Sequence, residues 1–299
     1  MLKIVKASEP MLVERINICI YSPPGLGKST LAFTAEDPVL FDCDKGAYRA
    51  KNRGDVIPVD KWADMAEMTP AELAPYKTVI VDTAGRALDF LSVDIIAKNA
   101  KMGFGGALTL QGYGQLKARF SAWLKMLRTF GKDVILIAHM DEQRNGDEVI
   151  ERLDVQGGSK GEIYKSVDAM GRLFMKGQDR LLDFNPRENS FGKNPCDLPV
   201  MPFPLGKTDM LAGVMAMIKD RLNKSVELSK DADRELQDWT IAINDCSTIE
   251  ELNALLPEIR KAAVAIRFLA QRRAKELHLT YDQKSQIYKP DNVPVGAAR

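Results

Sequence analysis

The segment 16–32 constrains this chain more than any other part of it. An apolar run, Ile16–Tyr21, leads into Ser22-Pro-Pro-Gly-Leu-Gly-Lys-Ser-Thr30 and then into residues that can begin a helix. A strand, a glycine-rich turn and a helix start in this order predict a phosphate-binding loop, because glycines let backbone N–H groups approach phosphate oxygens. Lys28 would add a full positive charge, and Ser29 would offer a hydroxyl to Mg²⁺.

The loop departs from the usual G-x-x-x-x-G-K-[ST] pattern at one position, where Ser22 replaces the first glycine. The positions nearest the phosphates are intact, so we expect the change to alter only the start of the loop. A chance Gly-Lys-Ser turn on the surface is the alternative, and the flanking strand and helix patterns argue against it. The predicted nucleotide contacts are Ser22, Pro23, Pro24, Gly25, Leu26, Gly27, Lys28, Ser29 and Thr30.

Composition narrows the classes of protein that this chain can represent. Its 299 residues carry 42 basic and 41 acidic side chains, so binding to nucleic acid would require local patches. The four cysteines lie far apart without a C-x-x-C pair, and only two histidines are present, which disfavours a zinc site and a disulfide framework. No apolar run approaches the roughly 18 residues of a membrane span. We expect a cytoplasmic protein without membrane contact.

Apolar runs and helical patterns alternate along the chain, which predicts an α/β fold. Such alternation indicates a mostly parallel sheet with helices on both faces. The further strands are expected at Val39–Phe41, Thr78–Asp82 and Asp133–Ala138, and the helices at Ala87–Asn99 and around the apolar stripe from Tyr113 to Leu127. Residues 170–175 and 180–184 predict an antiparallel hairpin that extends the sheet. Residues 141–161 are polar and predict a mobile loop.

A change in composition beyond residue 224 predicts a boundary between a core, residues 1–224, and a small helical region with a frayed tail, residues 225–299. Ser247-Thr-Ile-Glu250 has the pattern of a capping box that starts a helix, and Pro257 is expected to begin the next one. Ile259, Ala263, Ile266 and Ala270 would then share one apolar face.

Asp82 ends a β-branched strand, the position at which P-loop ATPases hold the Mg²⁺ water shell with a carboxylate. An ordinary turn aspartate is the alternative. Tyr48 follows the preceding strand and could stack on adenine, although such an aromatic often serves packing only. The cofactors predicted from these residues are ATP and Mg²⁺.

Three segments together resemble the RecA-type recombinase core: Phe41-Asp-Cys-Asp44, Val79-Ile-Val-Asp82 and Ile135-Leu-Ile-Ala-His139. The resemblance implies that Asp44 activates the attacking water and that His139 senses the γ-phosphate. Asp44 stands where RecA has a glutamate, one methylene longer. A solvated loop acid and a core histidine are the corresponding alternatives.

The segment Gly157–Val167 resembles the end of the second DNA-binding loop of RecA, in which a glycine pair lets backbone amides approach single-strand phosphates. The first such loop would be Lys98–Gly114. Flexible surface turns are the alternative for both loops. The DNA-binding residues implied are Lys98, Lys101, Phe104, Gly157, Gly158, Ser159, Lys160 and Lys165.

Gly192-Lys-Asn-Pro195 resembles the RecA segment whose lysines reach ATP on the next subunit, so Lys193 would be a catalytic residue acting in trans. A solvated lysine is the alternative. The whole set, over about residues 10–210, looks most like phage-encoded RecA-like ATPases of single-strand annealing recombination. That resemblance implies a DNA-stimulated, Mg²⁺-dependent ATPase that binds single-stranded DNA and assembles into filaments or rings. A single-strand binding protein or a recombination exonuclease would be further partners.

Two other functions remain open from the sequence. One is a hexameric helicase-type motor or loader, which shares the same core. The other is a nucleotide-binding scaffold with little turnover, which the departures at Ser22 and Asp44 would permit.

Overall fold

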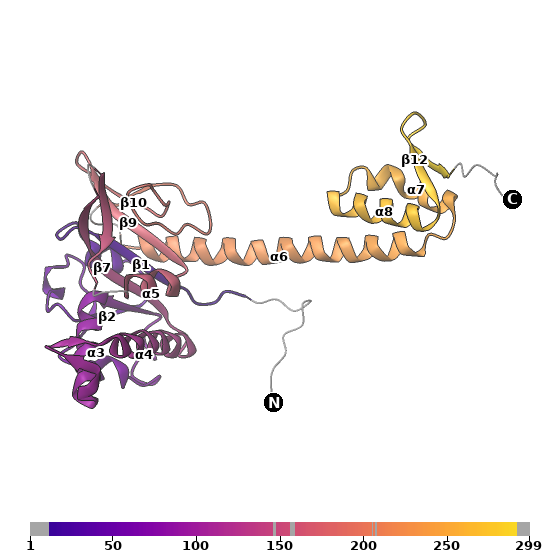
Figure 1. Cartoon of the computed structure of the whole chain (residues 1–299). Coiled ribbons are helices and arrows are strands. Elements are labelled where there is room, and N and C mark those ends of the chain that lie inside the picture. Colours follow the sequence, from indigo (N-terminus) through magenta and orange to yellow (C-terminus); the bar gives the residue numbers. More distant parts are fainter. Residues whose placement is uncertain (1–11, 146–147, 156–158, 205, 207, 292–299) are drawn as a thin grey trace. The chain divides into compact units, whose positions relative to one another are not determined.

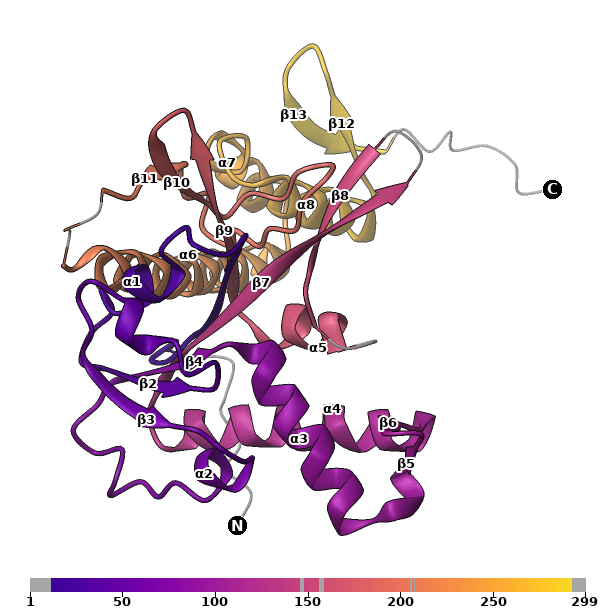
Figure 2. The same ribbon diagram turned by 90° about the vertical axis from the view of Figure 1, so that its left-hand side faces the viewer.

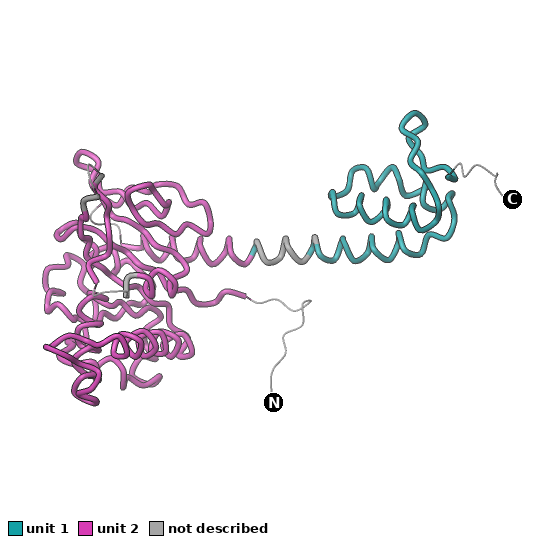
Figure 3. The backbone as a smooth tube through the Cα atoms, viewed as in Figure 1, with its two compact units in different colours: residues 1–11, 224–299 teal, residues 12–223 magenta. Residues whose placement is uncertain are grey.

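The computed structural model describes residues 12–145, 148–155, 159–204, 206 and 208–291, and these form two compact units (Figures 1 and 3). Residues 12–223 make up the first unit, and residues 224–291 are the described part of the second. The division falls within one helix, α6 (Met210–Asp245).

A mixed sheet organises the first unit, with the spatial order β11-β10-β9-β1-β7-β4-β2-β3 and with β8 paired to β7. From β9 to β3 every neighbouring pair is parallel, and β10 and β11 extend the sheet in antiparallel fashion. The strands are β1 (Asn17–Ser22), β2 (Pro38–Asp42), β3 (Asp55–Pro58), β4 (Thr78–Asp82), β7 (Asp133–Asn145), β8 (Glu148–Leu153), β9 (Ala169–Lys176), β10 (Asp179–Asp183) and β11 (Met201–Pro202). The predicted α/β class, the parallel sheet and the antiparallel extension are confirmed.

Helices cover both faces of this sheet (Figure 2). Alternate strand residues enter two separate apolar clusters: Val79 and Val81 pack with helices α3 and α4, whereas Ile80 packs with α1 and α6. This alternation follows from the two-residue period of a strand, and it explains why the central strands are apolar throughout. The helices of this unit are α1 (Lys28–Ala32), η1 (Ala47–Arg49), α2 (Ala63–Ala66), α3 (Ala84–Lys98), η2 (Ala100–Met102), α4 (Leu110–Thr129), α5 (Ser159–Ser166) and the start of α6.

The prediction of a mobile loop at residues 141–161 is wrong. Strand β7 continues to Asn145 and pairs with β8 in a hairpin, and α5 begins at Ser159. The inward positions of β8 and the residues after it are Glu151, Leu153 and Val155, all buried. Because the first of these is a glutamate, bonded to the Arg172 guanidinium, the alternation of apolar residues was not recognisable in the sequence.

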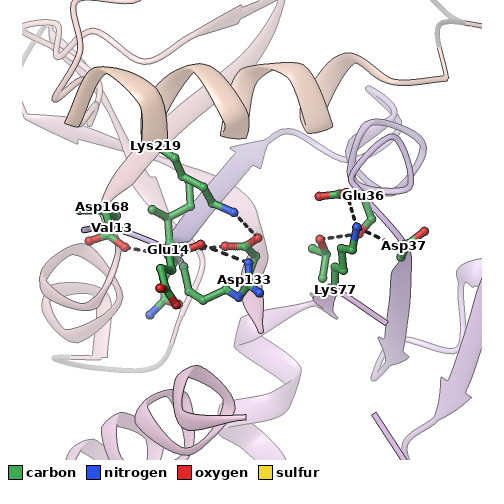
Figure 4. A network of polar contacts seen from close by, with 12 residues as sticks. Val13, Glu14, Glu36, Asp37, Lys77, Asp133, Asp168 and Lys219 are labelled. Atoms are coloured by element: carbon green, nitrogen blue, oxygen red, sulfur yellow. Dashed lines mark hydrogen bonds and ion pairs between the residues drawn. The ribbon is translucent and has the colours of Figure 1, made fainter. Parts of the chain in front are cut away.

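Polar contacts attach α6 to the beginning of β7 (Figure 4). Lys219 Nζ lies 2.6 Å from Asp133 Oδ2, and the second oxygen of this buried carboxylate accepts a hydrogen bond from Ile16 N at 2.8 Å. Lys77, in the same view, pairs with Glu36 at 2.5 Å, but both of these side chains are about half exposed. The two ion pairs therefore differ mainly in burial.

The second unit has a core of its own, built from the end of α6, α7 (Ile249–Ile259), α8 (Val264–Glu276) and the hairpin β12 (Leu279–Asp282) with β13 (Ile287–Pro290). The hairpin was not predicted. The capping box lies one residue later than expected, at Thr248 and Glu251, because two overlapping quartets fit the pattern.

Pro257 does not begin the next helix, as the sequence predicted, but lies inside α7, which continues to Ile259. The expected single apolar face is consequently divided. Ile259 belongs to α7, Ala263 is the exposed N-cap of α8, and Ile266 and Ala270 are buried residues of α8. Because proline has no N–H, it cannot donate the hydrogen bond to the carbonyl four residues back, and the helix continues for only two further residues.

Among the described residues, no helix combines the length and the apolarity that crossing a bilayer requires.

Candidate nucleotide site

The loop after β1 has the backbone that its glycines permit. Gly25 and Gly27 have φ angles of +81° and +93°, in the left-handed region where a side chain would be strained. Helix α1 begins at Lys28, directly after Gly27. Ser22, at the first-glycine position, is fully buried, and its Oγ donates to Pro23 O at 2.8 Å. The serine therefore bonds to the loop's own backbone.

The Lys28 ammonium lies inside the turn of this loop. Its Nζ donates to Ser22 O and Pro23 O, both at 3.0 Å, and lies 3.3 Å from His139 Nδ1. Burial lowers the pKa of Lys28 to about 8, although the carboxylates of Asp82 and Asp44 act in the opposite direction. A buried ammonium whose partners are mostly neutral would gain strongly from a phosphate oxygen.

Two possible oxygen ligands lie together here: Ser29, at the start of α1, and Asp82, at the end of β4. Ser29 Oγ donates to Asp82 Oδ2 at 2.5 Å. Burial raises the pKa of Asp82, while the Ser29 hydrogen bond lowers it and nearby Asp44 raises it further. A hydroxyl and a carboxylate beside a phosphate cradle fit the hard-oxygen preference of Mg²⁺, which would offset the charge of bound phosphates. These two residues would hold the ion.

Asp44 links the phosphate loop to the beginning of α3. Its Oδ2 lies 3.5 Å from His139 Nε2, and its Oδ1 lies 3.5 Å from Arg86 Nε. Burial acts to raise the pKa of Asp44, but hydrogen bonds from His139 and Thr83 and the charge of Arg86 outweigh it, so this pKa lies below its ordinary value. Asp44 is consequently an anion near neutral pH, as a water-activating group must be.

Strand register explains why these groups meet. Ser22 pairs with His139, Asp82 with Ile137, and Asp42 with Asp82, so the carboxyl ends of β1, β4 and β2 lie at one edge, level with His139 within β7. At that edge lies a pocket of about 430 Å³, within the range of small-molecule sites. The sequence-predicted residues that line it are Pro24, Gly25, Gly27, Lys28, Ser29, Thr30, Asp44, Asp82 and His139.

Two arginines of this region were not predicted from the sequence. Arg49 lines the nucleotide pocket, whereas the neighbouring Tyr48 does not, and its ring is 73% exposed under the Arg49 guanidinium. Arg86 was missed because it lies in the first turn of a helix, four residues after Asp82. Arg49 belongs to a basic stretch, residues 48–53, and this stretch was the only signal in the sequence that pointed to it.

The predicted DNA-binding residues lie in two places. Lys98 ends α3 and pairs with Asp94 at 3.1 Å, and Lys101 and Phe104 follow it in exposed positions. Of the second group, Gly157 and Gly158 lie outside the described residues. Ser159 and Lys160 begin α5, and their side chains are not among those described; Lys165, near the end of α5, is exposed.

Lys193 lies away from the phosphate loop of its own chain. It forms a bridge with Met170, and its Nζ donates to Val167 O at 2.5 Å, just before β9. The small pocket that it lines contains Asn17, the first residue of β1, whereas the phosphate loop follows the last. A contact with ATP would therefore require a second copy of the chain.

The family comparison agrees with this geometry. A family model described as an AAA domain matches residues 14–196, which is more than half of the chain and includes every strand from β1 to β10. No curated protein matches the chain. Among solved structures, a KaiC-like protein from the hyperthermophilic archaeon Pyrococcus horikoshii OT3 is similar, with 13% identity, a TM-score of 0.36, and 70% of this chain and 97% of that one covered. The chain belongs to this AAA-domain family, and its fold is that of a P-loop ATPase.

Proposed function

We propose that this chain is a Mg²⁺-dependent ATPase that binds single-stranded DNA and pairs complementary strands in recombination. The observation that carries the proposal is an exposed phenylalanine on a hairpin that helix α3 connects to the phosphate site. The hairpin lies within Lys98–Gly114, the first DNA loop expected from the resemblance to RecA.

The hairpin consists of β5 (Gly103–Phe104) and β6 (Ala107–Leu108), which are joined by Gly105 and Gly106 with φ angles of +57° and +83°. Two consecutive positive φ angles are the signature of a tight two-residue turn. Phe104 is 87% exposed, and Leu110, just beyond the hairpin, is 92% exposed. An aromatic ring displayed in this way offers a stacking face that every base can use.

The hairpin is firmly packed at its base. Thr109 N donates to Met102 O at 2.8 Å, and Gly112 N donates to the Thr109 hydroxyl. A Cβ at Gly112 would lie 2.5 Å from Met102 O, so only glycine permits this approach. The exposure of Phe104 is thus a property of a defined structure, which supports a binding role.

Helix α3 connects the end of β4 to this hairpin (Figure 2). It begins at Ala84, two residues after Asp82, and its first turn carries Arg86, the partner of Asp44. It ends at Lys98, from which η2 leads into β5. A shift of α3 on ATP binding would move the hairpin, so nucleotide state and DNA affinity would be coupled.

Self-association forms part of the proposal. The Val167 carbonyl holds Lys193 just before β9, at the end of the strands away from the phosphate loop. A neighbouring copy could bring its ATP into reach there. A filament or ring on single-stranded DNA would then complete each site in trans. A single-strand binding protein or a recombination exonuclease would meet the same DNA.

The test is the rate of ATP hydrolysis with and without a single-stranded oligothymidine. We expect strong stimulation in the wild type. Phe104→Ala should need a correspondingly higher DNA concentration for half-maximal stimulation, and its basal rate should remain unchanged. Loss of one stacking ring corresponds to about 1–3 kcal/mol of DNA binding, or about 5- to 150-fold in Kd. Val93→Ala, an exposed apolar change on the outer part of α3, is the matched control and should retain full stimulation.

Each other outcome has a defined meaning. If the wild-type rate of ATP hydrolysis does not respond to DNA, the proposal is refuted and the ATPase has another function. Closed rings that form without DNA and unwind a fork would favour a helicase-type motor. DNA binding that persists unchanged in Lys28→Ala would favour a nucleotide-binding scaffold. Annealing itself is measured by energy transfer between two labelled complementary strands.

A further inference from the structure

The second unit contains a pocket that the proposed function does not use. It has a volume of about 520 Å³ and lies between α7, α8 and the β12–β13 hairpin. Its floor is apolar, with Leu256 and Ile259 from α7, Ala274 from α8 and Leu279 from β12. All of these residues belong to the core of one unit, so the pocket is a feature of that unit alone.

Positive charge surrounds the mouth of this pocket. Arg267 and Lys275 lie on one side of α8, separated by two turns, with Gln271 midway between them. Arg260 approaches from the end of α7 and is held in place by the carbonyl of Gln286. Residues four apart share a helix face, so the two α8 cations and the glutamine face the pocket together.

The charges at the mouth are poorly compensated. Most other basic side chains of the unit have acidic partners: Lys261 pairs with Glu258, Arg273 with Glu276, and Lys289 with Asp282. Arg267 and Lys275 have no acidic partner within the described part of the chain. Asp291, whose carboxylate accepts a hydrogen bond from the Thr280 hydroxyl, is the one acidic residue among the described residues that line the pocket.

We propose that this pocket binds an acidic peptide segment of a partner protein that carries an apolar anchor residue. The apolar floor would take the anchor, while Arg260, Arg267 and Lys275 would pair with carboxylates on either side of it. Two tyrosines, Tyr281 and Tyr288, also line the pocket, but they pack edge to face against each other. The buried aliphatic floor therefore favours an apolar peptide side chain over a stacked base. The inference is independent of the proposed function, since none of these residues belongs to the nucleotide site or to the β5–β6 hairpin.

The test measures binding of a peptide pool to the full chain by fluorescence anisotropy. The probe is a pool of fluorescein-labelled heptapeptides with Asp or Glu at five positions and Leu, Ile or Phe at the other two. We expect saturable binding that weakens with salt, because the contacts include partly exposed charges. A pool with Lys in place of the acidic residues should not bind.

Two variants test the pocket, and one controls for charge. Arg267→Glu with Lys275→Glu should weaken binding at least about tenfold, or about 1.4 kcal/mol. Gln271→Trp should do the same by filling the mouth from an exposed position. The control is Lys261→Glu with Lys284→Glu, which makes the same change in net charge outside the pocket and should leave binding intact. Circular dichroism and thermal unfolding would establish that each variant is folded.

Four results would overturn the proposal. The first is the absence of saturable binding by the wild type, and the second is equal loss in the test and control variants. The third is displacement of the peptides by a single-stranded oligonucleotide that depends on Arg267 and Lys275, which would assign the surface to nucleic acid. The fourth is binding that appears only after deletion of residues 292–299, which would assign the pocket to the chain's own end.

Discussion

The protonation state of Lys28 leads to a quantitative prediction about nucleotide binding. In the nucleotide-free protein, burial brings the pKa of this ammonium down from 10.5 to about 8. If ATP binds only the charged form, the apparent Kd rises by the factor 1 + 10^(pH − pKa). Affinity at pH 9 should therefore be about tenfold weaker than at pH 7, a difference of about 1.4 kcal/mol.

The assay is an equilibrium titration with a fluorescent ATP analogue between pH 7 and pH 9.5. The terminal phosphate, with a pKa of about 6, is ionised throughout this range, so its own titration does not contribute. Lys28→Arg is the matched control, because a guanidinium stays charged up to at least about pH 12. Its affinity should be independent of pH over the same interval.

The pH dependence of the unfolding free energy provides a second measurement, and its direction is opposite to that of the affinity for ATP. Between about pH 8 and pH 10.5 the unfolded chain keeps the Lys28 proton that the folded chain has released. Stability should therefore increase with pH across this window, by up to about 3 kcal/mol relative to Lys28→Met. A wild-type affinity that stays constant up to pH 9, or an equal decline in Lys28→Arg, would refute the assignment of the buried ammonium as the titrating group.

Three further predictions follow from particular contacts. Asp44→Asn should lower the kcat for ATP hydrolysis by about 10²- to 10⁴-fold and leave the Kd for ATP within about twofold, as measured by single-turnover kinetics and titration. Gly112→Ala should destabilise the protein by about 1–3 kcal/mol in urea unfolding, since its Cβ would meet the Met102 carbonyl, whereas Gly114→Ala in the same helix has open space and should stabilise it by about 0.5–1 kcal/mol. Lys219→Met should cost about 3 kcal/mol by leaving a buried carboxylate without its cation, whereas Lys77→Met, at an exposed pair, should cost less than about 1 kcal/mol; equal losses would contradict this account.

Local patterns were sufficient to predict most of the core. The phosphate loop, the β-branched strand ending at Asp82 and the hairpin at residues 169–183 are each defined by neighbours within a few positions. Their backbone preferences and apolar runs can therefore be recognised in the sequence without knowledge of the fold. The predictions that failed, at residues 141–161 and at Pro257, concern segments whose conformation depends on distant partners. Glu151, for example, can face the interior only because Arg172 is there to meet it.

The sequence by itself determined which chemical groups are present: a lysine in a glycine-rich turn, carboxylates and a histidine at the ends of strands, and cations on α8. The tertiary structure alone decided which of them meet. Strand β7 lies between β1 and β4 although it follows both in the chain, and this order brings His139 between Lys28 and Asp44. Lys193, in contrast, contacts the beginning of β9, away from the phosphate loop. Strand order depends on the packing of whole helices against a sheet, a sum over many long-range contacts that no local stretch of residues encodes.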